Sequence, residues 1–303
     1  MKNILFRADA SFRIGTGHIM RDLVLAEQYP NSKIIFATQE LEGNLNYKII
    51  ESGYEVVTVD SNSINEVNKL IKKYDIDMLV IDHYGINYDY EKALKEENSS
   101  LTILSFDDTY EKHYCDILLN HNVFGDVSKY ENLVPSTCKV RCGKEYTLLR
   151  NEFIVAKKKV IRSTKQKRCV FNIFIAMGGA DHSNINIKIL KVLQKFPNIH
   201  IHLVTTTSNQ HLLELKQYIN LLDNITLYVN TNKIAQLMSE ANFAIITPSV
   251  TINEVLYLEI PFIAIKTADN QKYMCDYLEK KNLYILEKFN SKELKKYIDL
   301  FIH

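Results

Sequence analysis

The chain has 303 residues, more than one ordinary hydrophobic core accommodates, so we expect two domains of roughly 150 residues each. Hydrophobic residues make up 46% and charged residues 24% of the sequence, a composition that excludes a disordered or fibrous protein. The 37 basic and 36 acidic residues leave a net charge of +1, which argues against a nucleic-acid partner held by phosphate neutralisation.

No apolar run approaches the roughly 18–20 residues of a membrane-spanning helix, and Arg7 and Asp9 interrupt the start before a signal-peptide core could form. We therefore expect a cytoplasmic protein without a membrane partner. The five cysteines are odd in number and scattered, which is typical of reduced thiols: Cys115, Cys138, Cys142, Cys169 and Cys275. Cys138 and Cys142 have a Cys-x3-Cys spacing with no second pair after it, so we expect no metal site.

In the first half of the chain, β-rich runs alternate with helix-favouring stretches. The expected strands are residues 3–7, 33–37, 55–59, 78–82, 101–106 and 116–120, and clear helical stretches include 63–74 and 89–98. Strands that alternate with helices predict a parallel sheet covered on both faces.

A basic stretch then separates the two halves. Residues 157–168 carry seven Lys or Arg in twelve positions. We interpret 156–168 as a solvated linker between an N-terminal domain of residues 1–155 and a C-terminal domain of residues 169–303. A polybasic membrane patch is the alternative, which no adjacent apolar anchor supports.

The second half repeats the alternation. Its expected strands are residues 172–177, 200–205, 226–229, 243–246, 261–265 and 284–287. The prediction is an α/β protein with two doubly wound, Rossmann-like domains that face each other across a cleft. Ligands of such sheets bind beyond the carboxyl ends of the strands, so we expect the functional residues there.

The segment RIGTGHIM (13–20) follows the first strand and opens a helix. Met20 stands where a dinucleotide fingerprint needs a third glycine, and no Lys-Ser/Thr pair follows Gly17 as a P-loop requires. What remains is a glycine turn that allows close backbone approach and puts His18 at a helix N-terminus. The helix dipole disfavours imidazolium, so a neutral His18 could accept a proton near neutral pH. The alternative is a helix-start histidine without chemistry.

Two further strand ends, RAD and IDHYG, carry polar residues. In a parallel sheet four of these residues would face the same edge as His18, namely Asp9, Asp82, His83 and Tyr84. One of the two aspartates could orient the imidazole of His18 and stabilise its protonated form, and the sequence leaves open which one does so.

In the second half, FIAMGGADHSN (174–184) predicts a strand that ends in Gly178 and Gly179, with Asp181 or Ser183 as the N-cap of the next helix. Free N–H groups at such a helix start suit a diphosphate, although glycines also serve plain strand-to-helix turns.

The segment TPSVTINE (247–254) places Glu254 on a short helix. Its carboxylate could accept both hydroxyls of a ribose, or it could be an ordinary exposed helix residue. Further on, Asn270 and Gln271 stand between a strand and a helix, where their amides could bind a sugar or phosphate or could simply cap the helix.

The combination of G-T-G-H, G-G-A-D, T-P-S-x-x-x-N-E and D-N-Q resembles the GT-B nucleotide-sugar enzymes over nearly the whole chain. The segments LFRADASFRIGTGHIMRDLVLA, LVIDHYG, ILSFDD, CDILLN, VRCGKEYTLLR and AMGGAD look more closely like the UDP-sugar hydrolases of the pseudaminic acid pathway. This resemblance implies a GT-B fold and hydrolysis of UDP-2,4-diacetamido-2,4,6-trideoxy-β-L-altropyranose to the free sugar and UDP. It also implies a monomer without a cofactor that serves flagellin glycosylation.

The resemblance also implies roles for single residues. His18 corresponds to the catalytic histidine beside the attacking water, Asn270 to a second active-site residue, and Glu254 to the residue that binds the ribose. The first domain would hold the sugar and the second the UDP. The expected catalytic residues are His18, Asn270, Asp9 and Tyr84, and the expected UDP-binding residues are Gly17, Gly178, Gly179, Ser249, Asn253, Glu254 and Gln271.

The expected chemistry follows from the leaving group. UDP departs readily, so the protein must stabilise the diphosphate charge and supply water from the opposite face, with His18 as general base. Attack at C1 predicts C–O cleavage with inversion. A GT-B glycosyltransferase with a lipid-linked acceptor and a binding module without catalysis are the alternatives, and UDP release without an acceptor separates them.

Overall fold

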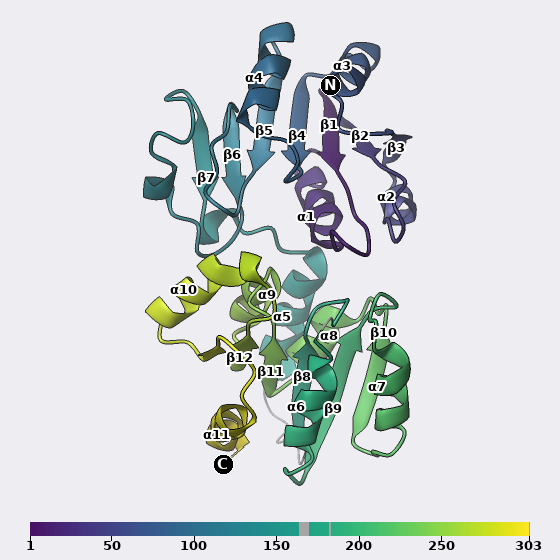
Figure 1. The fold of residues 1–303 in the computed structure, drawn as a ribbon, viewed down its shortest axis with the longest axis vertical. Coiled ribbons are helices and arrows are strands. Elements are labelled where there is room, and N and C mark those ends of the chain that lie inside the picture. The colour runs from purple at the N-terminus through teal and green to yellow at the C-terminus, as the bar shows by residue number, and fades with distance from the viewer. Residues whose placement is uncertain (164–169, 182, 303) are drawn as a thin grey trace. The chain divides into compact units, whose positions relative to one another are not determined.

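The computed structural model describes residues 1–163, 170–181 and 183–302, and the chain divides into two compact units, Met1–Leu148 and Leu149–His303. Each unit is a parallel sheet with helices packed against it (Figure 1). The predicted α/β class with two doubly wound domains is confirmed.

The first unit contains a seven-stranded sheet in the order β3-β2-β1-β4-β5-β6-β7, in which the chain starts in the middle and winds outward in both directions. Its strands are β1 (Asn3–Ala8), β2 (Lys33–Thr38), β3 (Glu55–Thr58), β4 (Met78–Asp82), β5 (Thr102–Phe106), β6 (Ile117–Asn120) and β7 (Lys139–Cys142). Its helices are α1 (Gly17–Ala26), α2 (Asn46–Glu51), α3 (Ile64–Lys73) and α4 (Tyr88–Glu97), with short 3₁₀ turns η1 (Val127–Tyr130) and η2 (Lys144–Tyr146).

The central strands of this sheet are apolar on both sides because both faces are covered there. Successive side chains of β1 alternate between the faces, so Phe6 packs in one core with Ile19 of α1, whereas Leu5 packs in the other core with Val67 of α3. This explains why the first strands appear in the sequence as continuous hydrophobic runs.

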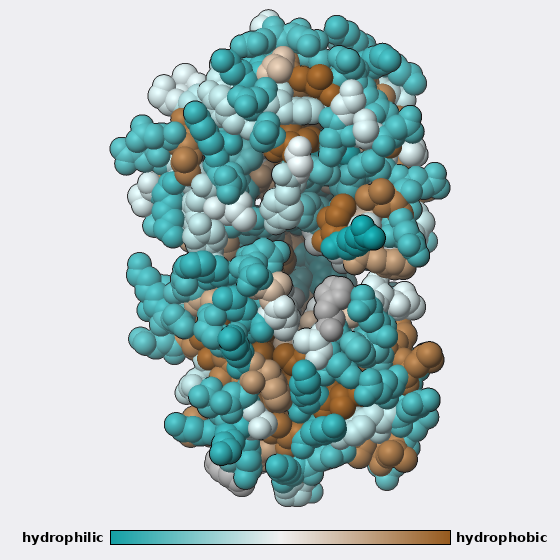
Figure 2. Space-filling model, viewed as in Figure 1, coloured by the Kyte–Doolittle hydropathy of each residue, from teal (hydrophilic) through white to brown (hydrophobic). Residues whose placement is uncertain are grey.

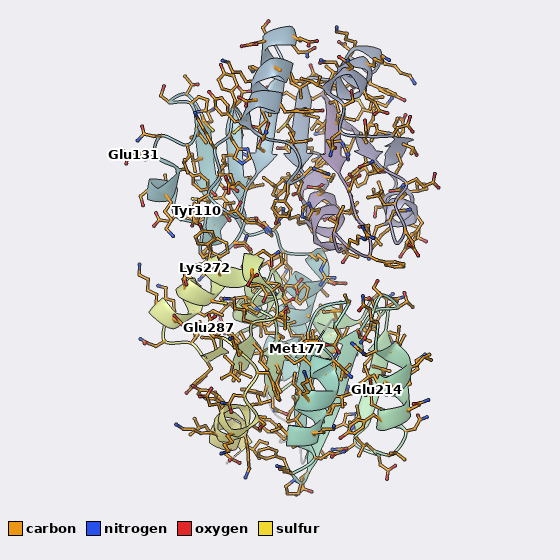
Figure 3. All side chains as sticks on the ribbon, viewed as in Figure 1. Tyr110, Glu131, Met177, Glu214, Lys272 and Glu287 are labelled. Carbon is orange, nitrogen blue, oxygen red and sulfur yellow. The ribbon has the colours of Figure 1, made fainter. Side chains whose placement is uncertain are left out.

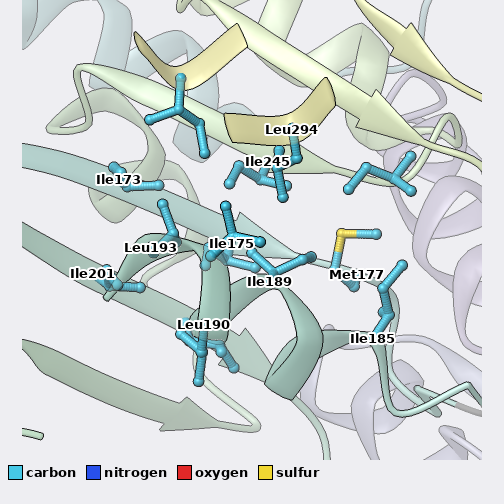
Figure 4. Close-up of a cluster of buried hydrophobic side chains, with 14 of the residues drawn as sticks. Ile173, Ile175, Met177, Ile185, Ile189, Leu190, Leu193, Ile201, Ile245 and Leu294 are labelled. Carbon is cyan, nitrogen blue, oxygen red and sulfur yellow. The ribbon is translucent and has the colours of Figure 1, made fainter. Parts of the chain in front are cut away.

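The second unit has a six-stranded sheet in the order β10-β9-β8-β11-β12-β13. Its strands are β8 (Phe171–Ala176), β9 (Ile199–Thr205), β10 (Ile225–Val229), β11 (Phe243–Ile246), β12 (Phe262–Ile265) and β13 (Ile285–Leu286). Its helices are α5 (Asn151–Ser163), α6 (Ile185–Leu193), α7 (Leu212–Ile219), α8 (Ile234–Ser239), α9 (Thr251–Leu258), α10 (Lys272–Lys280) and α11 (Ser291–Ile302), with a 3₁₀ turn η3 (Asp269–Gln271). Figure 4 shows its core, where Ile173 and Ile175 of β8 pack with Ile189 of α6 and Leu294 of α11.

The boundary between the units differs from the prediction. The division falls after Leu148 rather than after residue 155, and residues 156–163 continue helix α5 instead of forming a linker. The physical reason is that α5 buries Phe153 and Ala156, while Lys157 donates a hydrogen bond to the carbonyl of Tyr257 on α9 at 2.6 Å. The rest of the predicted linker, with Cys169, lies outside the described residues.

On the face shown in Figure 2, hydrophilic residues predominate and hydrophobic ones form scattered patches. In the part of the chain that the structure describes, no helix is both long and apolar enough to cross a membrane.

Candidate functional site

His18 lies where the sequence predicts it, in the first turn of α1. The loop between β1 and α1 is held by Ser11, whose Oγ accepts hydrogen bonds from the N–H groups of Arg13 and Ile14. Gly15 then takes a left-handed backbone conformation, with φ +88°, that a side chain would strain. The turn therefore delivers His18 to the start of the helix.

The carboxyl end of β4 orients the imidazole. His18 Nδ1 lies 2.9 Å from the main-chain oxygen of Asp82 and 3.2 Å from Asp82 Oδ1. Because both neighbours of Nδ1 are acceptors, the proton of a neutral ring is assigned to Nδ1, and Nε2 carries the lone pair. Asp82 is therefore the aspartate that supports His18, the question that the sequence leaves open.

Arg21, one turn after His18 on α1, ties this aspartate to the rest of the site. Its Nε donates to Asp82 Oδ2 at 2.6 Å and its Nη2 to Asp82 Oδ1 at 2.5 Å. A third nitrogen, Nη1, donates to Asp108 Oδ2 at 3.2 Å. Burial raises the pKa of the Asp82 carboxyl, but the charges of Arg21 and His18 outweigh burial and hold this pKa below its usual value. Asp82 is thus a fixed anion behind the imidazole.

Tyr84 completes the cluster. Its ring meets that of His18 edge to face at 5.0 Å between centroids, and its hydroxyl donates to both oxygens of Asp108, at 3.0 and 3.1 Å. Tyr84 is 60% exposed, yet the partial desolvation of its hydroxyl and then the charge of Asp108 raise the pKa of Tyr84, so the phenol remains a proton donor. Tyr84 and His18 therefore lie at the same edge of the sheet, as the sequence predicts.

Burial favours the neutral form of two groups behind the cluster, His121 and Asp22. Burial and the charge of Arg21 lower the pKa of His121 to about 3, and its Nε2 lies 3.4 Å from Arg21 Nη1. Asp22 is fully buried, and burial raises its pKa well above the usual value. Among the described residues neither carboxyl oxygen of Asp22 has a hydrogen-bond partner. Arg21 donates its hydrogen bonds to the carboxylates of Asp82 and Asp108 instead.

Asp9, which the sequence analysis expects to be catalytic, is not brought to His18. Its two oxygens accept hydrogen bonds from Arg7 Nη1 and Nη2, each at 2.8 Å, and His83 Nε2 lies 3.2 Å away. Both members of the Arg7–Asp9 pair are fully buried. Burial raises the pKa of Asp9, but His83 and Arg7 hold it far below its usual range. The oxygens of Asp9 are therefore occupied by the buried Arg7 and the half-buried His83, and the expected contact of Asp9 with the reacting atoms stays a prediction.

A cavity of about 660 Å³ opens beyond the carboxyl ends of β4 and β5. Arg21, Asp82 and Tyr84 contribute to its lining, so the cavity adjoins the residues that contact His18. The loop after β5 forms another part of the lining, with Asp107, Lys112 and His113.

His113 anchors this loop. Its Nδ1 lies 2.8 Å from Oε1 of the buried Glu91 on α4, and its Nε2 lies 3.9 Å from Asp107 Oδ1. Asp107 also accepts the hydroxyl of Tyr130 at 2.8 Å. Tyr110, labelled in Figure 3, belongs to the same loop and packs its ring against Tyr130 at 5.0 Å. The loop is therefore fixed by a buried imidazolium between two carboxylates.

This arrangement predicts a pH-dependent contribution to stability. Burial lowers the pKa of His113, but hydrogen bonds and charges from Asp107 and Glu91 outweigh it and raise the pKa from 6.5 to about 10. Because its pKa is raised in the folded protein, His113 stabilises the fold fully at pH values below its pKa in the unfolded chain. This stabilisation is lost as the pH rises through about 10. At about pH 6, urea unfolding should give His113→Gln a free energy of unfolding that is lower than that of the unmutated chain by on the order of 3 kcal/mol. The deficit should shrink towards about pH 10, whereas a constant deficit would contradict a charged His113.

In the second unit, Gly178 and Gly179 follow β8 as predicted. Gly178 has φ +82° and open space around it, while a side chain at Gly179 would meet Thr206 Oγ1 at 2.9 Å. The start of α6 differs from the expected free anion site, because Asp181 already accepts the N–H groups of Ile185 at 2.7 Å and Asn186 at 3.3 Å. Two of the N–H groups expected for a diphosphate are therefore occupied by a side chain of the same loop.

Hydroxyl groups gather instead at the N-terminus of α9. Thr247 Oγ1 lies 3.1 Å from Ser249 Oγ, which lies 3.5 Å from Thr251 Oγ1. Asn253, the next predicted residue along the helix, is 2% exposed. Three hydroxyls at a helix N-terminus suit an anion, because the helix dipole and the O–H donors both favour negative charge.

Glu254 lies on α9, one turn after Thr251. Its side chain is buried, whereas an ordinary helix residue would be exposed. Arg150 holds it, with Nη2 donating to Oε1 at 2.8 Å and Nε to the same oxygen at 3.3 Å. Burial raises the pKa of Glu254 above its usual value, and Arg150 opposes this. The sequence analysis did not single out Arg150, although it closes the VRCGKEYTLLR segment.

Asn270 and Gln271 lie in the 3₁₀ turn η3, after β12 and before α10. Gln271 Oε1 accepts the N–H groups of Thr267 at 2.8 Å and Ala268 at 3.2 Å, so this side chain closes the turn, as the capping alternative expects. Asn270 is exposed. The expected ligand contact of Asn270 stays a prediction.

Possible metal ligands do not converge in the structure. Within residues 1–163, 170–181 and 183–302, no group of three or more His, Cys, Asp or Glu could hold a metal ion. Cys138 lies closest to Cys115, with 3.7 Å between their sulfur atoms, and both thiols are free.

Comparison with known proteins places this geometry in context. No family model matches the chain. The UDP-2,4-diacetamido-2,4,6-trideoxy-β-L-altropyranose hydrolase of Campylobacter jejuni is 43% identical over 286 residues, covering 94% of this chain and 99% of that protein. Among solved structures, MurG of Acinetobacter baumannii has a TM-score of 0.66 at 13% identity and covers 100% of this chain and 91% of that one. The spinosyn rhamnosyltransferase SpnG has a TM-score of 0.64 at 11% identity, covering 100% and 92%. The expected GT-B fold is confirmed by these structural neighbours.

Proposed function

The chain belongs to the family of the UDP-2,4-diacetamido-2,4,6-trideoxy-β-L-altropyranose hydrolase, and on this premise we propose that it hydrolyses that UDP-sugar to UDP and free 2,4-diacetamido-2,4,6-trideoxy-L-altrose. The structural observation that carries the proposal is the contact of His18 Nδ1 with Asp82, which leaves Nε2 as a base. Both Asp82 and Tyr84, which contact His18, line the cavity of the first unit.

In the proposed reaction, His18 Nε2 accepts a proton from a water molecule as that water attacks C1 of the sugar. The C1–O bond to UDP breaks, the configuration at C1 inverts, and the electron pair leaves with the diphosphate. Asp82 stabilises the imidazolium that forms, because its carboxylate lies 3.2 Å from Nδ1. Arg21 keeps Asp82 ionised and fixed in place, since it donates two hydrogen bonds to that carboxylate. A positioned general base of this kind accelerates a reaction about 10²–10⁴-fold.

For UDP we propose the N-terminus of α9 in the second unit. The hydroxyls of Thr247, Ser249 and Thr251 would donate to the diphosphate, and their donation would stabilise the charge that develops as UDP departs. Gly178 offers an open backbone approach after β8, and Glu254 would accept the ribose hydroxyls. The first unit, with its cavity, would take the sugar.

We also propose a cytoplasmic enzyme that acts as a monomer and supplies free sugar for flagellin glycosylation. The support is the scattered cysteines, which are typical of reduced thiols, together with the family membership. The shared GT-B fold leaves a transferase as the competing activity, which differs in one respect: it needs an acceptor other than water.

The test is incubation of the purified protein with the UDP-sugar and no acceptor, followed by ³¹P and ¹H NMR. We expect stoichiometric UDP and free sugar, with the inverted anomer appearing before mutarotation. UDP release only after a lipid or glycan acceptor is added would overturn the hydrolase assignment in favour of a transferase.

A further inference from the structure

We propose that Arg150 is a positioning residue for ribose recognition: it engages one oxygen of Glu254 and leaves the other oxygen for the ribose hydroxyls of the nucleotide. The inference rests on the proposed function, because Glu254 meets a ribose only if the second unit binds UDP. It adds a residue from outside α9 to that site and gives the buried pair a role in selectivity.

The hydrogen bonds are divided unequally between the two carboxyl oxygens. Arg150 Nη2 and Nε both donate to Oε1, at 2.8 and 3.3 Å. Among the residues that the structure describes, none donates to Oε2 of Glu254. An ionised carboxylate oxygen accepts about two hydrogen bonds, so Oε2 has capacity for both hydroxyls of a ribose.

Besides Glu254, the guanidinium of Arg150 has two further contacts. Its carbon lies 4.8 Å from the ring centroid of the fully buried Phe153, and its Nη1 lies 2.6 Å from Glu152 Oε1. The backbone of Arg150 is fixed too, since its carbonyl accepts the N–H of Phe153 at 3.0 Å at the start of α5. A planar cation held in this way sets the orientation of the Glu254 carboxylate, which a flexible ammonium would do less well.

Charge is the second part of the role. Burial favours the neutral form of Glu254, Glu152 repels its negative charge, and Arg150 is the cation that opposes both. Lys157, the next described basic residue on the buried side of α5, pairs with Glu259 at 2.9 Å, beyond the end of α9. Hydrogen bonds to an ionised acceptor are roughly twice as strong as neutral ones, so loss of Arg150 should weaken the ribose contact through both orientation and ionisation.

The experiment measures calorimetric binding of UDP and of 2′,3′-dideoxy-UDP to the unmutated chain, Arg150→Gln, Arg150→Lys and Lys157→Gln. We expect the unmutated chain to bind UDP about 10- to 100-fold more tightly than dideoxy-UDP. A hydrogen bond from a hydroxyl to a carboxylate contributes a binding free energy that corresponds to this ratio. Arg150→Gln should lose most of this preference while its affinity for dideoxy-UDP changes little. Lys157→Gln, which removes a different α5–α9 contact, should keep the preference.

A pH series separates orientation from ionisation. For Arg150→Gln, the preference for UDP should increase as the pH rises, because removal of the cation favours the neutral form of Glu254 and a higher pH ionises it again. Arg150→Lys keeps the charge, so its preference should be intermediate and independent of pH. The diphosphate titrates equally in both ligands and cancels in their ratio.

The outcomes are distinguishable. If the unmutated chain binds neither nucleotide, the proposed UDP site fails and takes this inference with it. If it prefers UDP and Arg150→Gln retains that preference with an unchanged melting temperature, only the role of Arg150 is overturned. A lower melting temperature together with an equal loss of both affinities would show that Arg150 supports the fold alone, which also contradicts the inference.

Discussion

Replacing His18 with alanine is expected to lower kcat for UDP release by about 10²–10⁴-fold, the usual contribution of a positioned general base. The Nδ1 side of the ring is engaged by Asp82, so the substitution removes the base at Nε2 and leaves Asp82 and Arg21 paired. The affinity for UDP, which we assign to the second unit, should change little. Steady-state kinetics and calorimetry on the same preparation give both quantities.

The matched control is His211→Gln, a half-buried histidine at the start of α7 whose Nδ1 lies 3.8 Å from Glu214. It should retain full kcat. If His18→Ala weakened UDP binding as strongly as it slowed turnover, or if turnover persisted within about threefold of the unmutated rate, the role of His18 as general base would be refuted.

Replacing Asp9 with alanine is expected to destabilise the fold by about 3–5 kcal/mol, because it leaves Arg7 as an uncompensated buried charge. Arg7 is fully buried, and besides Asp9 it donates to the carbonyl oxygens of Ala8 and Ala37, each at 3.2 Å. These neutral acceptors do not replace a carboxylate. Urea unfolding of the unmutated and variant chains measures the difference in the free energy of unfolding.

The double variant Arg7→Met, Asp9→Leu provides the control, since a buried ion pair replaced as a unit by apolar residues often costs little. It should be more stable than Asp9→Ala. A catalytic Asp9 would behave differently: the single variant would keep its stability and lose kcat, and the double variant would not restore kcat.

The sheets could be predicted from the sequence because both of their faces are buried, which makes the strands continuous apolar runs between helix-favouring segments. Strand β7 was missed, since Lys139 and Arg141 flank Val140 at an edge that is only partly covered. The second half of helix α5 was taken for a linker because of its run of basic residues. The buried residues Phe153 and Ala156, which lie three positions apart on one helical face, show instead that α5 packs on the second unit.

The first candidate site was predictable in part. His18 and Tyr84 lie at the same edge of the sheet, as expected, because β1 and β4 are neighbours, with Ala8 opposite Asp82. The choice between Asp9 and Asp82 depends on which one already has a partner. Arg7 and Asp9 lie two positions apart, so they project to the same side of an extended strand, a signal for a local ion pair that the sequence analysis did not use.

In the second unit, the glycines after β8 and the helix that carries Glu254 were predicted, but their surroundings were not. Asp181 or Ser183 was predicted as the N-cap of α6. Whether an anion can bind at the start of α6 depends on the hydrogen bonds that Asp181 makes, which the sequence does not show. Arg150 lies 104 positions from Glu254, so no local pattern could pair them.

The measurement that tests the central claim most directly is hydrolysis of the UDP-sugar in ¹⁸O-labelled water without an acceptor, with mass spectrometry of both products. Water attack at C1 places the label in the free sugar and leaves UDP unlabelled, and the account predicts this result for the unmutated chain and its loss with His18→Ala. Label in the β-phosphate of UDP would show P–O cleavage and contradict the proposed chemistry at C1.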